Sequence, residues 1–103
     1  MLLEKTRFDE NDVVTIKLVS GEEVLGKFIV DDGSTITLDK PLMLAMNQKG
    51  MGLVPLLVTV NPDTKLKFNK HGVTLMTHSD DEIAKQYTYQ TTGIQPITSG
   101  SFA

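Results

Sequence analysis

The chain has 103 residues, 40% of them apolar, and a formal net charge of −3 with a pI near 5.2. This length fits a single domain, and the composition is globular rather than disordered. The absence of cysteine excludes a disulfide scaffold and any thiolate nucleophile or metal ligand, and the acidic balance disfavours nucleic-acid binding through bulk charge alone.

Strand-forming residues dominate the composition. Valine, isoleucine and threonine make up 27 of the 103 residues, whereas alanine occurs three times, so we expect a mostly β domain. No apolar run reaches the roughly 20 residues that span a bilayer. Residues Met1–Glu4 lack the apolar core of a signal peptide, so the expected location is the cytoplasm and not a membrane.

The first half of the chain alternates between apolar and polar residues. Residues 1–12 form a polar N-terminal segment, and the alternation of apolar and polar residues over 13–19 then predicts a half-buried strand, with these residues inward: Val14, Ile16 and Leu18. A turn at 20–22 is so short that the next strand, near 24–30, must form a hairpin with the first. Gly26 within it indicates a bulge, a bend or a close backbone approach, and a bend would let the sheet curl into a small barrel.

The middle of the chain contains a third strand and a strongly apolar segment. After a tight turn at Asp31–Ser34, Ile36 and Leu38 point inward, the pattern is interrupted at Asp39–Pro41, and it resumes in the same phase to Met46. A proline inside a strand pattern indicates an edge strand or a bulge. Residues 47–52 read as a loop. The following segment, 53–60, is apolar on both faces, so as a strand it needs a partner surface beyond its own core.

The last part of the chain predicts two short strands and a helix. A turn at 61–64 precedes a β segment at 66–68, the residues 69–72 interrupt it, and 73–77 form the last strand. Ser79 and Glu82 have the spacing of a capping box, which predicts a helix over 80–91. The domain plan is therefore a β barrel over 13–78, a helical segment over 79–92 and a tail over 93–103.

The motifs favour a non-catalytic protein without a metal or cofactor. His71 and His78 are seven residues apart, which places them on opposite faces of a regular strand, and neither begins a metal-ligand spacing. Asp31–Ser34 lacks the alternate acids and the closing glutamate of a calcium loop, and Gly50–Gly52 lacks the third glycine of a dinucleotide-binding loop. No serine lies in a nucleophile elbow. We expect no catalytic residues.

The pair Lys70-His71 has two interpretations. It follows Phe68 and precedes Val73 at an interruption between two strands. In one interpretation it is a hairpin turn with solvated side chains. In the other it is a corner that faces a ligand, where Lys70 meets a phosphate while His71 and Asn69 stack against or hydrogen-bond to a base.

The order of these elements resembles the Sm/LSm family, including its bacterial Hfq branch, and in particular the divergent small Sm-like proteins of marine bacteriophages. The positions that resemble the first family motif are Ile16-Lys17-Leu18, Gly21, Gly26, Phe28, Asp31 and Ile36-Thr37-Leu38. The second motif falls on Phe68–Val73, where Lys70-His71-Gly72-Val73 is similar to the Hfq form. The chain departs from the family at Thr35, where an asparagine is usual, and in a helix that follows the barrel.

The resemblance implies a small, strongly bent, five-stranded antiparallel Sm-like (SH3-like) barrel with one C-terminal α-helix, assembled into a homo-oligomeric ring that binds single-stranded RNA or DNA. Family rings close through strands of neighbouring subunits, a role that the apolar segment 53–60 would fill. A ring would gather the cations of every copy around its pore. The residues that would bind nucleic acid are Gly33, Ser34, Thr35, Asn69, Lys70 and His71.

A second function stays open at this point. The same fold would serve as a protein-interaction or structural module with no nucleic-acid ligand. The acidic excess favours it, as do Ile94, Ile97 and Phe102 of the tail, which would dock on a partner. The alternatives for the tail are disorder and packing on its own barrel. The number of subunits in a ring depends on the interface angle, which the sequence does not define.

Overall fold

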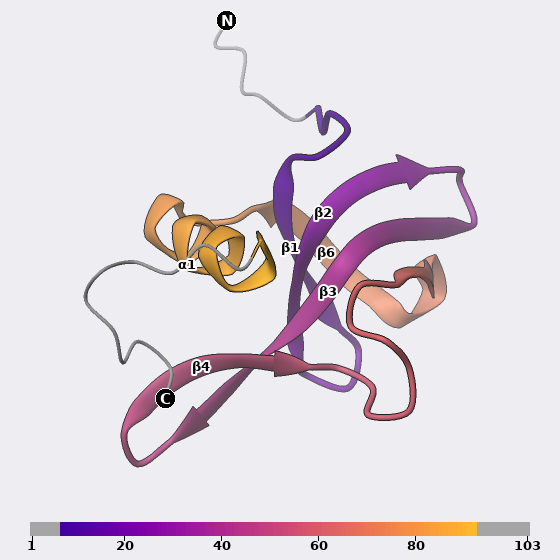
Figure 1. Cartoon of the computed structure of the whole chain (residues 1–103). Coiled ribbons are helices and arrows are strands. Elements are labelled where there is room, and N and C mark those ends of the chain that lie inside the picture. The colour runs from indigo at the N-terminus through magenta and orange to yellow at the C-terminus, as the bar shows by residue number, and fades with distance from the viewer. Residues whose placement is uncertain (1–6, 93–103) are drawn as a thin grey trace, which may run out of the picture.

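The computed structural model describes residues 7–92 and contains six strands and one α-helix (Figure 1). The strands are β1 (Val13–Leu18), β2 (Glu23–Asp31), β3 (Thr35–Asn47), β4 (Gly50–Pro55), β5 (Lys65–Asn69) and β6 (Val73–His78). A 3-10 helix, η1 (Lys70–Gly72), joins β5 to β6, and α1 (Asp81–Thr92) follows β6. The expected tail at 93–103 and the first half of the expected N-terminal segment lie outside the described residues.

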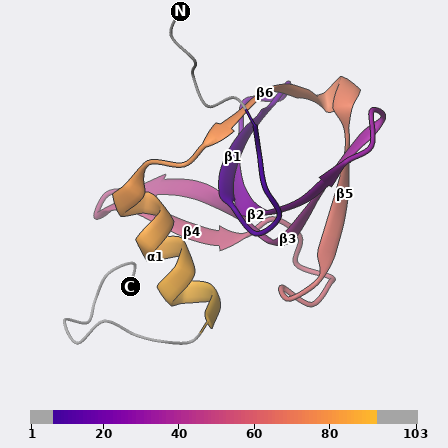
Figure 2. The ribbon, with the colours of Figure 1, turned by 90° about the horizontal axis from the view of Figure 1, so that it is seen from above.

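The strands form one antiparallel sheet in the order β4-β3-β2-β1-β6, and β5 also pairs with β3. The prediction of a mostly β domain with one C-terminal helix is confirmed. The sheet has six strands where five were expected, and it is not closed. Viewed from above, the strands curve around a centre that apolar side chains fill, and η1 links β5 and β6 at one corner (Figure 2). In the described part of the chain no helix has the length and apolar character needed to cross a membrane.

The concave side of the sheet encloses a group of buried side chains that we call the inner cluster: Val14, Ile16, Val24, Phe28, Ile36 and Leu38. The alternation in β1 therefore places Val14 and Ile16 in the core as predicted. Gly26 marks a close backbone approach, because a Cβ atom at this position would lie 2.9 Å from the Cβ of Leu38. A larger residue would push β2 away from β3.

The interruption predicted at Asp39–Pro41 is a bulge within one continuous strand, β3, which bends there. From Leu25 to Phe28, β2 advances three residues while β3 advances four, from Leu38 to Leu42. The extra residue is a β-bulge, and Lys40 adopts a positive φ of 51°. Because the bulge reverses the side-chain alternation, Leu42 lies on the opposite face of the sheet from Leu38. The sequence predicted that both would share one face, and this prediction is wrong.

The bulge also divides the partners of β3 along one edge. Residues Thr35–Asp39 pair with β5, and residues Leu42–Asn47 pair with β4. Proline has no backbone N–H, so Pro41 fits the gap between these two ladders.

The apolar segment 53–60 is only partly a strand. Strand β4 begins at Gly50, inside the expected loop, because a two-residue turn returns the chain onto β3, and it ends at Pro55. Residues 56–64 leave the sheet and form a loop before β5. The expectation of one strand apolar on both faces is wrong, and the loop instead exposes Val58 to 93% of its maximum.

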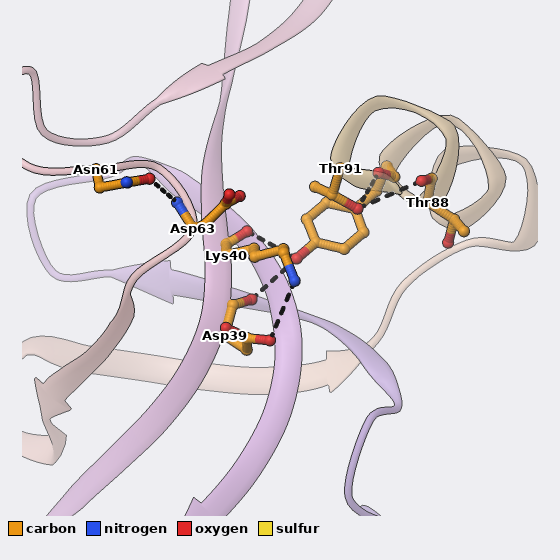
Figure 3. Close-up of polar contacts among 7 residues, drawn as sticks. Asp39, Lys40, Asn61, Asp63, Thr88 and Thr91 are labelled. Carbon is orange, nitrogen blue, oxygen red and sulfur yellow. Dashed lines mark hydrogen bonds and ion pairs between the residues drawn. The ribbon is translucent and has the colours of Figure 1, made fainter. Parts of the chain in front are cut away.

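Helix α1 covers the opposite face of the sheet and completes a second group, which we call the helix cluster: Leu25, Leu42, Leu53 and Tyr87. The hydroxyl of Tyr87 donates toward two backbone carbonyls at the bulge, 2.9 Å from Asp39 O and 2.7 Å from Lys40 O. In Figure 3, Asp39 and Lys40 lie between two elements. On one side is helix α1, which carries Thr88 and Thr91, and on the other is the loop that carries Asn61 and Asp63.

The helix begins at a different cap from the one predicted. The carboxylate of Asp80 accepts from the N–H groups of Glu82, at 3.1 Å, and Ile83, at 3.4 Å. The hydroxyl of Ser79 hydrogen-bonds to Thr15 Oγ1 at 2.7 Å, so it is held by β1 and not by the helix. The predicted helix is confirmed to within one residue, and its cap moves from Ser79 to Asp80 because β1 competes for the serine.

Candidate functional site

The turn between β2 and β3 is held by two aspartates. Asp31 Oδ1 accepts from the N–H of Gly33 at 2.9 Å. Asp32 Oδ1 accepts from the N–H groups of Ser34 and Thr35, at 2.9 and 2.8 Å, and Asp32 Oδ2 accepts from the Thr35 hydroxyl at 3.0 Å. Gly33 has a positive φ of 96°, which favours glycine. The predicted tight turn is confirmed.

The corner between β5 and β6 is held by Asn69. Its side-chain oxygen accepts from the N–H of His71 at 2.9 Å, which caps the single turn of η1. This leaves the side chains of Asn69, Lys70 and His71 exposed at the surface. The interruption predicted at 69–72 is therefore a 3-10 turn.

The structure brings the turn and the corner together. Thr35 and Asn69 are partners in the β3–β5 ladder, and the N–H of Lys70 donates to the carbonyl of Ser34 at 3.0 Å. We call this surface the turn–corner patch, defined by Gly33, Ser34, Thr35, Asn69, Lys70 and His71. All six residues predicted as a binding site thus lie in one place, although about 35 residues separate the two segments in the sequence.

The patch is mixed in charge rather than purely basic. The ammonium of Lys70 lies 3.0 Å from Asp31 Oδ2. The N–H of Gly33, and next the ammonium of Lys70, lower the pKa of Asp31 below its usual value. The N–H groups of Thr35 and Ser34 lower the pKa of Asp32 in the same way, with a smaller contribution from the charge of Lys67. Both carboxylates therefore stay ionised at neutral pH.

Two further lysines extend the patch along β5. Lys65 and Lys67 are exposed and alternate with Leu66 and Phe68, which are turned inward. Sequence reasoning missed these lysines as site residues because it considered only Leu66 and Phe68 of this short β segment. The period-two pattern Lys-Leu-Lys-Phe was the available signal, since residues two apart on a strand share a face.

The two histidines lie on either side of the start of β6, His71 in η1 before the strand and His78 as the last residue of the strand. His71 belongs to the patch, whereas His78 stacks on Phe8, with ring centroids 4.6 Å apart, and places Nε2 3.1 Å from Asp12 Oδ2. Within residues 7–92 no three histidine or carboxylate side chains gather in a way that would hold a metal ion. The patch offers amide, imidazole, hydroxyl and ammonium groups, which suit hydrogen bonding, stacking and phosphate contact.

The sequence matches no protein-family model and no curated protein. The site is therefore interpreted from its own geometry.

Proposed function

We propose that this chain is a non-catalytic Sm-like subunit that binds single-stranded RNA or DNA through the turn–corner patch. The contact between Ser34 and Lys70 carries the proposal. It joins the two segments that the family resemblance assigns to one nucleotide pocket, where Asn69, Lys70 and His71 are exposed to solvent. An exposed imidazole and amide next to an ammonium are suited to one base and its phosphate.

A single copy has little net positive charge at the patch, because Asp31 pairs with Lys70. Binding of a nucleic acid therefore requires several patches on one assembly, which contact the same strand together. Within the described residues, β5 pairs on one side with β3, and β6 pairs on one side with β1. Unpaired strand edges readily accept another chain, so β5 of one copy and β6 of the next would join subunits into a ring that closes the open sheets. This assigns to β5 the interface role that the sequence analysis gave to 53–60.

Fluorescence anisotropy with short labelled uridine-rich and adenine-rich oligonucleotides tests the binding. We expect micromolar affinity that falls as salt rises, because phosphate contacts release counterions. The double variant Lys70→Ala with His71→Ala should lose most of the signal. Lys85→Ala removes an exposed lysine of α1 outside the patch and should bind like the natural chain. No binding at micromolar protein would contradict the proposal.

Sedimentation velocity tests the assembly. A ring has a mass that is a multiple of the 11.3 kDa chain. Replacing Lys67, which lies inside the proposed β5 interface, with proline should shift the protein to smaller species, because proline cannot donate to a strand ladder. Val58→Pro, in the exposed loop outside every strand, is the control for a general effect of proline. A monomer at all concentrations would argue against the ring.

The Asp31–Lys70 pair favours a second candidate function, a protein-interaction module without a nucleic-acid ligand. In that case the carboxylates neutralise the patch, and the exposed apolar loop with Leu57, Val58 and Val60 meets a protein. A pull-down that recovers a single protein, resistant to nuclease and free of nucleic acid, would support this function. Loss of the partner in the patch variant but not in Val58→Ser would argue against the loop as the contact.

A further inference from the structure

Helix α1 covers only part of an apolar face on the β3–β4 hairpin. On this hairpin Leu44 is paired with Leu53, and the next pair on the same face is Met46 with Met51. The first pair belongs to the helix cluster, where Leu53 is 4% exposed. The second pair extends the same face beyond the helix, and Met46 and Met51 are 74% and 46% exposed.

The helix ends next to this uncovered pair. The side-chain amide of Gln90 donates to the carbonyl of Leu53 at 2.8 Å, which fixes the last turn of α1 to the middle of β4. The helix ends two residues later, at Thr92. Met51 is two residues from Leu53 along β4, a step of about 7 Å. An extended chain covers about 3.3–3.6 Å per residue, so a few residues beyond Thr92 are enough to reach Met51.

The sequence that follows the helix has the right chemistry to cover the pair. Residues 93–103 carry Ile94 and Ile97 within the first five positions after Thr92, with no charged residue in the segment. We propose that this segment of the same chain packs across Met46 and Met51 and continues the cover that α1 begins. The occupant is thus the protein's own C-terminal segment, and the interaction is apolar. This inference does not depend on the proposed function.

Methyl NMR on the full chain, with methionine and isoleucine methyl groups labelled, tests the contact directly. Single Met46→Leu and Met51→Leu variants assign the two methionine signals. We expect cross-relaxation between these methyl groups and those of Ile94 and Ile97. A sample that mixes methionine-labelled with isoleucine-labelled chains shows whether the contact forms within one chain or between two copies. Cross-relaxation that appears in this mixture shows a segment supplied by a second copy and overturns the proposal.

Methionine oxidation gives an independent measurement, because an apolar cover slows the reaction of peroxide with the thioether. The double variant Ile94→Ser with Ile97→Ser should oxidise several-fold faster at Met46 and Met51, while the half-buried Met76 of β6 keeps its rate as an internal reference. Ser99→Ala, in the same segment, is the matched control and should leave all rates unchanged. Equal rates at Met46 and Met51 in the double variant and the natural chain would overturn the proposal.

Discussion

The inner cluster and the helix cluster lie on opposite faces of one sheet, and different elements supply their buried side chains. The inner cluster draws its six buried side chains from β1, β2 and β3, so each strand supplies two of them. The helix cluster takes one buried residue from outside the sheet, Tyr87. Its hydroxyl reaches the backbone of the bulge that also directs Leu42 to this face. One cluster thus follows from regular alternation, and the other depends on a single irregular position and the side chain that contacts it.

The largest effect is expected in the inner cluster. Leu38→Ala removes a side chain with no exposure, and it empties the space next to Gly26. We expect a loss of about 2–5 kcal/mol in the free energy of unfolding, from lost burial and the cavity left behind. Urea denaturation measures it. Val58→Ala, at a side chain that is almost fully exposed, should change stability by less than about 0.5 kcal/mol.

A smaller effect is expected when the helix cluster loses its link to the bulge. Tyr87→Phe keeps the buried ring but removes the hydrogen bonds to the carbonyls of Asp39 and Lys40. We expect a loss of about 1–2 kcal/mol, since two part-buried acceptors lose their donor. Tyr89→Phe, on the same helix and half-buried, is the matched control. Equal stability of the two variants would show that the ring alone holds the helix.

Alkaline pH should weaken the helix cluster before the inner cluster. Burial, and next the negative charge of Asp39, raise the pKa of Tyr87 above its ordinary value. The folded state therefore keeps the phenol protonated after the unfolded state has begun to ionise. The stabilisation that the protonated phenol of Tyr87 gives the folded state is complete below about pH 10 and falls as pH rises above that value. Denaturation between pH 9 and 11 should show a steeper fall for the natural chain than for Tyr87→Phe.

The helix cap predicts a further, modest effect. Asp80→Ala removes the acceptor for the first N–H groups of α1 and should cost about 1 kcal/mol. Circular dichroism during thermal unfolding measures it. Ser79→Ala tests the competing interpretation, because this variant loses only the bond to Thr15. If Ser79→Ala lowered the helical signal more than Asp80→Ala, Ser79 would be the cap.

The smallest effect concerns the turn that supports the patch. The N–H groups of Thr35 and Ser34 lower the pKa of Asp32, so its stabilising effect is present above the usual carboxyl pKa and is lost as pH falls through the lowered value. NMR titration of the amides of Ser34 and Thr35 should give a midpoint below that of an unperturbed aspartate. Asp32→Asn should remove this titration and leave the inner cluster unchanged.

The regular parts of the fold were predictable from the sequence, because alternation alone determines which face a strand buries. This held for Val14 and Ile16 of β1. At Gly26 the sequence left a bulge, a bend and a close backbone approach open, and the structure shows the close approach. The alternation failed after Lys40, because Pro41 indicates an edge or a bulge without deciding between them, and the one extra residue of the bulge reverses every later side chain. The loop at 56–60 was assigned to a strand because its valines and leucines favour strands locally, whereas the chain leaves the sheet after Pro55.

The candidate site was predictable in part of its residues but not in its charge. The turn and the corner were identified separately, and only the β3–β5 ladder shows that Thr35 and Asn69 are neighbours. The pairing of Lys70 with Asp31 depends on this three-dimensional contact, so it was invisible to spacing arguments. Lys65 and Lys67 were missed for a different reason, because their period-two alternation with Leu66 and Phe68 was present in the sequence but not used.

The bulged strand β3 also makes the molecule convenient to label. Its first residue, Thr35, lies in the patch, and its last, Asn47, lies at the tip of the hairpin, so a 13-residue strand separates the two by up to about 40 Å. Since the chain has no cysteine, a thiol introduced at Gln48 would be unique. A fluorophore attached there would sit far from any oligonucleotide on the patch, and energy transfer between donor- and acceptor-labelled chains would follow subunit exchange in real time.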